Sequence, residues 1–346
     1  MARVIDLRSD TVTLPTPAMR QAIASAELGD DVFGEDPTVR RLEEMASGLM
    51  GKEAGLLTVS GTMSNLVALL TFCGRGDEAI LGSESHILHY EVAGAAALGG
   101  IAYRSLANDE QGMLDPEAVA MAIRGSDIHF PRTGVVCLEN THNRRGGRAL
   151  GAGDVAAIAD VAQQRRTPLY VDGARIFNAA AALDTQAADL VREADAVAFS
   201  LCKGLVAPVG SVLCGSAQLI ARARKMRKMV GGGMRQAGVI AAAGIVALET
   251  MRDRLVEDHA TAKALARGLA QIPGIVIDPD TVETNIVIFR LDGLEVPDFQ
   301  ARLRQLGVLS STSGPHRIRM VTHYGISRDD IDEALERVST AMAVRA

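Results

Sequence analysis

The chain has 346 residues, of which 48% are hydrophobic and 23% charged, with a formal net charge of -6 at pH 7. This composition excludes a disordered or coiled-coil protein and is enough for one large domain and a smaller one. Three features predict a cytoplasmic protein with no nucleic-acid or membrane partner. The net charge is negative, no apolar run reaches roughly 18 residues, and the first residues lack the apolar stretch of a signal peptide.

Short β-rich runs alternate with Ala-rich segments of helical spacing in the first part of the chain. We expect strands at residues 55–59, 79–81, 134–139, 169–172, 196–200 and 209–214. Two helix starts are marked, since Asp115 precedes Pro116 and Asp154 precedes a helical run at 155–162. The alternation predicts an α/β fold with a mostly parallel sheet and helices on both faces.

The order of strands and helices changes after a long helical region, which we expect at about residues 237–270. Strands are expected at 275–277, 286–290 and 317–321, and helices at 297–306 and 329–342. This pattern predicts a smaller α+β domain at the carboxyl end. We therefore place a large domain at residues 1–250, including an amino-terminal arm at 1–15, and a small domain at 251–346.

An aspartate and a lysine follow two successive apolar strands. Taken alone, Asp172 is explained equally well as a helix cap. Lys203, taken alone, is explained as an ordinary solvated side chain. Together they match what pyridoxal phosphate requires. A lysine amine forms a Schiff base with this cofactor, and an acid hydrogen-bonded to the pyridine nitrogen keeps the ring protonated.

The cofactor's phosphate needs backbone N–H groups at a helix start. Gly61 and Thr62 lie between an expected strand and an apolar helix, where the glycine permits close approach and the threonine adds a hydroxyl. Many α/β turns look like this one, so the motif is informative only because Asp172 and Lys203 follow it.

A flat side chain must cover one face of the cofactor ring, and His86 is the candidate, with Tyr90 nearby. The alternative is a metal site made by His86 and His89 with Glu84 or Glu91. We disfavour it and predict no metal, because no Cys or further His nearby completes a ligand set.

Six segments spread over nearly the whole chain resemble the low-specificity L-threonine aldolases. They are residues 6–13, 29–38, 138–143, 171–175, 203–204 and 227–236. The resemblance implies the aspartate-aminotransferase-like fold (fold type I) with a seven-stranded type of sheet. It also implies a homo-oligomer, a dimer of dimers with shared active sites, that cleaves L-threonine, L-allo-threonine and related β-hydroxy-α-amino acids to glycine and an aldehyde.

The resemblance also implies roles for individual residues. Lys203 would be the Schiff-base lysine, Asp172 the pyridinium partner and His86 the residue stacked on the ring. Other cofactor contacts would come from Gly61, Thr62 and Arg175, and from Lys228 and Arg235 of a neighbouring subunit. Ser9, Arg175 and Arg319 would surround the substrate carboxylate, with His129 and Tyr90 near the substrate side chain.

Aldol cleavage needs a base for the β-hydroxyl and a fixed carboxylate. His86 and His129 are both candidates for the base, and the sequence does not choose between them. Arg319, on an apolar strand, suits bidentate binding of a carboxylate. A cationic neighbour such as Arg175 would favour the unprotonated amine of Lys203.

Rival interpretations use the same residues. Asp172 and Lys203 would serve β-elimination or transamination equally well. A remote alternative is an NAD-dependent dehydrogenase, suggested by Gly151-x-Gly153-x-x-Ala156 with Asp172 further on, but that fingerprint must directly follow a strand. The basic helix at 219–229 is better explained by Lys228 near a phosphate than by an acidic partner. The basic stretch at 144–148 predicts only a solvated loop.

Overall fold

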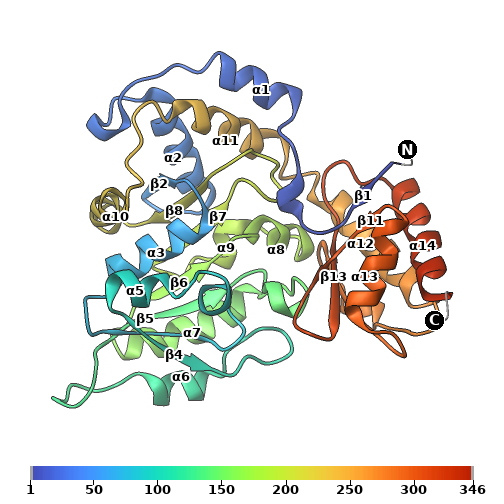
Figure 1. Ribbon diagram of the computed structural model, residues 1–346. Helices are drawn as coiled ribbons and strands as arrows, with labels where there is room; N and C mark the ends of the chain where they lie inside the picture. The colour runs from blue at the N-terminus through green and yellow to red at the C-terminus, as the bar shows by residue number, and fades with distance from the viewer. Residues whose placement is uncertain (1–2, 344–346) are drawn as a thin grey trace.

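The apolar runs of the first two thirds of the chain build one seven-stranded sheet, in the order β2-β8-β7-β6-β5-β3-β4 (Figure 1). The computed structural model describes residues 3–343. The strands are β2 (Ala54–Thr58), β3 (Glu78–Gly82), β4 (Ala102–Leu106), β5 (Thr133–Glu139), β6 (Leu169–Asp172), β7 (Ala196–Ser200) and β8 (Ser211–Gly215). Strand β8 runs in the direction opposite to the other six strands, so the predicted mostly parallel sheet is confirmed. We did not predict β4, because this edge strand is only partly buried and carries polar residues.

Both faces of the sheet are covered by helices, because the central strands are apolar on both sides. Successive residues point to opposite faces, so Val171 packs in one core and Tyr170 in the other. The helices are α1 (Pro17–Ala24), α2 (Pro37–Leu49), α3 (Gly61–Phe72), α4 (His86–His89), α5 (Gly94–Gly99), α6 (Pro116–Ala122), α7 (Ala152–Gln164), α8 (Ile176–Ala182), α9 (Ala187–Leu190), α10 (Ala217–Met229) and α11 (Gly238–Thr250). Helices α3, α5 and α10 share a core on one face, and α2, α6, α7, α8 and α11 share the core of the other.

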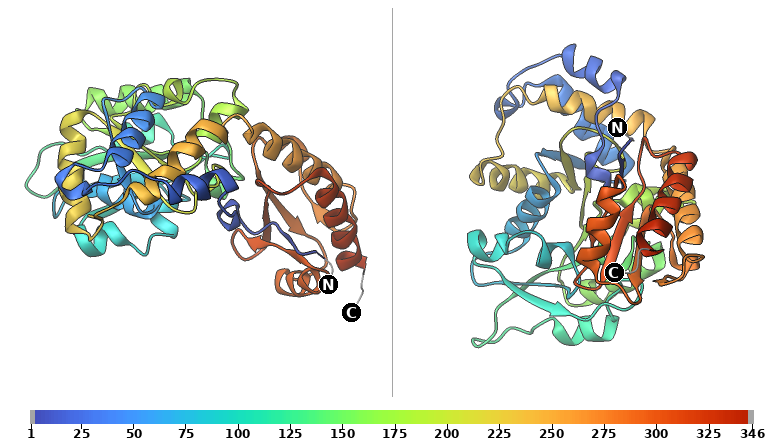
Figure 2. Two further views of the ribbon diagram at one scale, coloured as in Figure 1. Left: turned by 90° about the horizontal axis from the view of Figure 1, so that it is seen from above. Right: turned by 45° about the vertical axis from the view of Figure 1, so that its right-hand side comes forward.

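A second, antiparallel sheet of four strands follows, in the order β12-β13-β10-β9. Its part of the chain contains α12 (Leu255–Leu269), β9 (Ile275–Val276), β10 (Ile286–Leu291), α13 (Val296–Gln305), β11 (Val308–Leu309), β12 (Ser311–Thr312), β13 (Arg317–Val321) and α14 (Arg328–Ala343). These elements bury a core of their own and stand to one side of the large sheet (Figure 2). The boundary at residue 250 stays a prediction. No helix within residues 3–343 is long and apolar enough to cross a membrane.

The amino-terminal arm crosses from the large sheet to the small one. Strand β1 (Ile5–Asp6) pairs in parallel with β11, and Ile5 and Leu7 lie in the core of the second unit. The arm then turns back through a short 3-10 helix, η1 (Asp10–Val12), toward the large sheet. It therefore carries its polar residues into the space between the two units.

The helical region expected at 237–270 is confirmed and consists of two helices, since α11 ends at Thr250 and α12 begins at Leu255. One local prediction was wrong. Asp154 is not the cap of α7: the helix starts after Gly151, and the Asp154 carboxylate accepts the Gly151 N–H at 2.8 Å from inside the first turn. The dinucleotide fingerprint also fails here, because β5 ends at Glu139 and no strand directly precedes Gly151. The Asp115 cap is confirmed.

Candidate active site

A cavity of about 500 Å³ lies between the two units, at the carboxyl ends of the parallel strands. Open α/β sheets bind ligands at this edge. Its lining contains six of the residues predicted for the site: Ser9, His86, Tyr90, Arg175, Lys203 and Arg319. The other lining residues are Arg8, Thr11, Val12, Asn143, Ser311, Thr312 and Ser313. We call this the substrate cavity.

Lys203 follows β7 and reaches the substrate cavity from the large sheet. The side chain is half-buried. The pKa of Lys203 is lowered mainly by this burial and secondly by the positive charge of Arg175. A lysine in this setting more readily presents an unprotonated amine, which nucleophilic attack on an aldehyde requires.

Asp172, at the end of β6, is held by two donors. Asn65 donates its Nδ2–H to Asp172 at 2.8 Å, and the backbone N–H of Ala174 donates to the other carboxylate oxygen at 3.2 Å. Asn65 is itself fixed, because Tyr170 donates its hydroxyl to the Asn65 Oδ1 at 2.6 Å. A carboxylate oriented in this way suits a ring N–H.

His86 begins helix α4 and is tied to the buried acid Glu91, which the sequence had suggested only as an alternative metal ligand. Its Nδ1 lies 2.8 Å from Glu91, and Asn65 also donates to Glu91 at 2.6 Å. Burial opposes the charge of His86, but the hydrogen bond with Glu91 and the charge of Asp172 outweigh it and raise the pKa of His86. Its Nε2 makes no hydrogen bond to any described residue.

His86, Glu91 and Asp172 also resemble a set of metal ligands. One ligand atom of each lies within 4.8 Å of the others. Asn65, however, donates to both carboxylates and thereby occupies the space between them. The absence of a metal at this position stays a prediction. The hydrogen bonds of Asn65 to both carboxylates favour an organic ring next to these three residues.

The start of α3 is a candidate phosphate cradle. A Cβ added to Gly61 would lie 3.3 Å from the Ser200 hydroxyl, so the missing side chain leaves room there. Ser200 is buried and its Oγ has no hydrogen-bond partner, a costly arrangement unless a ligand supplies one. We missed Ser200, although it stands three residues before Lys203. The exposed Thr62 completes the helix start, and this set fits a phosphate ester.

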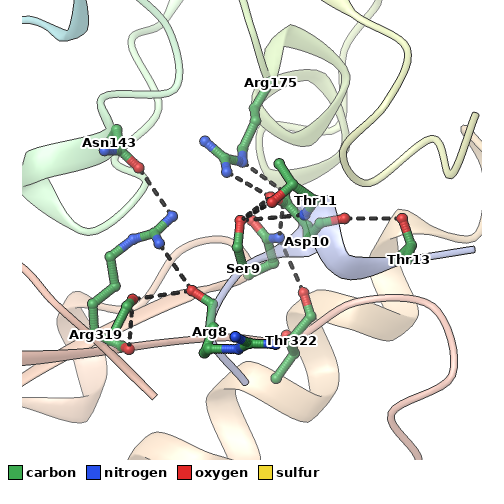
Figure 3. A network of polar contacts seen from close by, with 11 residues as sticks. Arg8, Ser9, Asp10, Thr11, Thr13, Asn143, Arg175, Arg319 and Thr322 are labelled. Atoms are coloured by element: carbon green, nitrogen blue, oxygen red, sulfur yellow. Dashed lines mark hydrogen bonds and ion pairs between the residues drawn. The ribbon is translucent and has the colours of Figure 1, made fainter. Parts of the chain in front are cut away.

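Arg319 approaches the cavity from β13 and has only neutral partners (Figure 3). It donates to the Arg8 carbonyl at 3.2 Å and to Asn143 Oδ1 at 3.1 Å, while its Nε is buried without a partner. Burial and the neighbouring charge of Arg175 lower the pKa of Arg319 to about 10. No acidic side chain within residues 3–343 pairs with it, so it can receive a carboxylate.

Arg175 is placed differently. Two of its nitrogens already donate to Asp10, at 2.7 and 2.6 Å, and both side chains are buried (Figure 3). Burial alone would raise the pKa of Asp10, but the guanidinium of Arg175 holds that pKa well below its usual range. Sequence reasoning missed Asp10 because nothing in the arm shows that it will meet residue 175. Only Nη1 of Arg175 is left without a described partner.

Six of the predicted residues do not line the substrate cavity of their own chain: Gly61, Thr62 and Asp172, described above, and His129, Lys228 and Arg235. His129 is on an exposed loop, with its Nδ1 2.7 Å from Asp127. Lys228 is exposed at the end of α10, and Arg235 is exposed and paired with Asp30. None of the three lines the cavity.

The fold and the site define a pyridoxal-phosphate-dependent enzyme of fold type I. The chain belongs to the beta-eliminating lyase family, whose model matches residues 6–292, and within it to the low-specificity L-threonine aldolases. It is 44% identical to low-specificity L-threonine aldolase 1 of Arabidopsis thaliana over 98% of this chain and 97% of that one. The corresponding enzyme of Escherichia coli K12 is 42% identical over 95% and 97%.

The threonine aldolase of Leishmania major shares the fold. Its structure has a TM-score of 0.83 and covers 98% of this chain and 100% of that one, at 18% identity. Enzymes of this family use pyridoxal phosphate. The oriented carboxylate of Asp172 and the amine of Lys203 fit that cofactor.

Proposed function

We propose that this enzyme cleaves L-threonine, L-allo-threonine and related β-hydroxy-α-amino acids to glycine and an aldehyde, and also runs the reverse addition. The observation that carries the proposal is the substrate cavity itself. It joins a lysine with a lowered pKa, a histidine backed by a buried acid, and an arginine without an acidic partner. The identity to named threonine aldolases over nearly the whole chain supports this reaction.

The cofactor's contacts follow from the residues around it. Gly61, Thr62 and Ser200 would hold the phosphate, Asp172 would accept the ring N–H, and the imidazole of His86 would cover one face. When bound, pyridoxal phosphate supplies an electron sink for the pair left on Cα. Lys203 would provide the amine that anchors the cofactor, and its burial, together with the charge of Arg175, lowers the pKa of that amine and so favours its unprotonated form.

Arg319 would bind the substrate carboxylate through its guanidinium fork. Asn143 and the Arg8 carbonyl hold the arginine by its Nη atoms, and its buried Nε has no partner among the described residues. A carboxylate fixed at this point orients the Cα–Cβ bond, and such positioning lowers the entropic part of the barrier. Ser9 lines the same end of the cavity.

We assign the base for the β-hydroxyl to His86. Its Nδ1 is engaged by Glu91, which leaves Nε2 as the nitrogen that can take a proton. Tyr90, whose ring centroid lies 5.3 Å from that of His86, would border the substrate side chain. His129 does not reach the cavity of its own chain, so any part it plays requires a neighbouring subunit.

We also propose a homo-oligomer, a dimer of dimers, in which one subunit completes the site of another. Lys228, Arg235 and His129 are exposed cationic or titratable residues outside their own cavity. Subunit association would bring Lys228 and Arg235 to the neighbour's cofactor phosphate, and His129 to the substrate side chain.

The test is the absorption spectrum of the purified enzyme together with an aldehyde-coupled assay on L-allo-threonine. We expect a yellow protein that releases acetaldehyde. Lys203→Ala should lose both the lysine-bound cofactor absorption and turnover, whereas the exposed Lys225→Ala should keep both. A colourless protein that pyridoxal phosphate cannot restore would refute the proposal.

The alternative reactions on the same residues give different products. β-Elimination from the same substrate would yield a keto acid and ammonia, and transamination would move the amino group to an added keto acid. A yellow enzyme that gives these products and no aldehyde would keep Lys203 and Asp172 in their roles and would exclude His86 as the aldol base.

A further inference from the structure

A second cavity, of about 440 Å³, adjoins the substrate cavity but shares no lining residue with it. Adjacent residues of the 3-10 helix η3 (Asn143–Arg145) line both, since Asn143 faces the substrate cavity and Arg144 the second one. Five arginines line it: Arg144, Arg145, Arg148, Arg290 and Arg317. We call it the arginine cleft. Apolar residues of β10 and of the segment around β9 also line it.

Three of these arginines have no acidic partner within residues 3–343. Arg144 pairs with Glu84 and Arg148 with Glu283, whereas no ion pair involves Arg145, Arg290 or Arg317. The cleft's own acids, Glu110 and Asp278, are exposed, and Asp278 accepts a hydrogen bond from the backbone of the next turn. The cleft therefore keeps an excess of positive charge.

The strand register forces two of these charges together. Arg290 on β10 lies directly opposite Arg317 on β13 in the antiparallel ladder, so both side chains project from the same face. Like charges in such a pair destabilise a sheet. The pKa of Arg317 is lowered mainly by burial and secondly by the positive charge of Arg144.

The hydrogen bonds within the cleft leave donors unused. Arg145 donates Nη2 to the Asn108 carbonyl at 3.1 Å, yet its Nε is buried without a partner. Arg317 donates Nε to the Ser313 carbonyl at 2.9 Å, which leaves both Nη groups. Guanidinium groups arranged in this way are suited to charge-assisted, bidentate bonds with oxyanions.

We propose that the arginine cleft binds a small oxyanion with at least two negative charges, of the phosphate-ester or polycarboxylate type. The anion would bridge Arg145 of the large unit and the Arg290–Arg317 pair of the small sheet. It would thereby remove the like-charge repulsion across β10 and β13. This site is separate from the substrate cavity and does not depend on which reaction occurs there.

The test uses the cofactor-loaded enzyme and titration calorimetry with two probes, pyrophosphate and citrate, at constant ionic strength. The test variant is Arg145→Gln with Arg290→Gln. The matched control is Arg192→Gln with Arg328→Gln, because it removes the same charge from exposed ion pairs elsewhere. We expect the parent and the control to bind, and the test variant to bind about tenfold or more weakly.

The outcomes separate the possibilities. Tighter binding of pyrophosphate than of citrate indicates a phosphate ester as ligand, and the reverse order indicates a polycarboxylate. The proposal is overturned if neither probe binds the parent at millimolar concentration, or if the test variant binds as tightly as the control. If the double variant does not fold, Arg290→Gln alone repeats the test, since Arg290 is exposed and donates no hydrogen bond to a described residue.

Discussion

The two ends of the proposed site are built in different ways. At the cofactor end, Gly61, Asp172 and Lys203 all follow strands of one sheet, and Asn65, a buried neighbour, holds the Asp172 carboxylate in place. At the carboxylate end, Arg319 comes from the small sheet, Asn143 from the 3-10 helix η3, and Asp10 from the amino-terminal arm.

The comparison shows that the first end is preorganised by a single sheet and the helices packed on it, whereas the second exists only while two units and the arm stay together. Changes at the cofactor end should therefore act on cofactor and proton chemistry with little loss of stability. Changes at the carboxylate end should alter either folding or substrate binding, depending on whether the charge concerned is already paired.

The largest effect should come from breaking the pair between the arm and the large sheet. Asp10→Asn leaves the guanidinium of Arg175 buried without its counter-charge, which costs about 3–5 kcal/mol of unfolding free energy. The folded-state pKa of Asp10 is lowered, so its stabilisation is present above the unfolded pKa and is lost as the pH falls below about 4. Denaturant unfolding at neutral and acid pH measures both effects.

Asp6→Asn is the control in the same arm. Asp6 pairs with Arg8 at the surface, so its loss should cost less than about 1 kcal/mol. Equal losses in the two variants would show that the arm contributes no specific pairing.

Arg319→Gln should spare stability but weaken substrate binding. We expect kcat/KM to fall about a hundredfold, because a bidentate charged contact with the carboxylate is lost. Arg319→Lys should recover only part of this, since an ammonium lacks the fork. Steady-state kinetics with Arg304→Gln, an exposed arginine on α13, as the control provide the measurement. An unchanged kcat/KM would place the carboxylate elsewhere, with Arg175 as the next candidate.

Glu91→Gln sharpens the comparison at the cofactor end. The acid's charge helps to raise the pKa of His86, so its removal should lower that pKa. The base is then unprotonated at lower pH, and the acid limb of the kcat/KM profile moves to lower pH, while kcat falls about tenfold. Glu117→Gln on α6 should leave the limb in place. A limb that does not move in Glu91→Gln would exclude His86 as the base.

The smallest effect is expected for Ser200→Ala. Removal of an unpartnered buried hydroxyl should leave the cofactor-free enzyme equally or more stable. The dissociation constant of pyridoxal phosphate should nevertheless rise about threefold to tenfold, because one phosphate contact is lost. Cofactor titration followed by absorbance tests this, and unchanged affinity would remove Ser200 from the phosphate cradle.

Sequence alone determined the α/β class and most strands of the large sheet, and it placed Asp172 and Lys203 after two successive strands. Apolar runs at strand spacing are a local signal, and Asp172 and Lys203 are readable because the carboxyl ends of parallel strands share one edge. The resemblance in six segments added the reaction. The sequence did not predict the polar edge strand β4 or the break between α11 and α12, because the local composition does not mark either of them.

Only the tertiary structure decided which charges meet. The bond between Asp10 and Arg175, the neutral partners of Arg319 and the hydrogen bond from His86 to Glu91 each depend on how distant or looped segments pack. The basic stretch at 144–148, expected to be a solvated loop, lines a cleft with Arg290 and Arg317 instead. Pairing of this kind depends on through-space distance and burial, and neither is encoded in the spacing of residues along the chain.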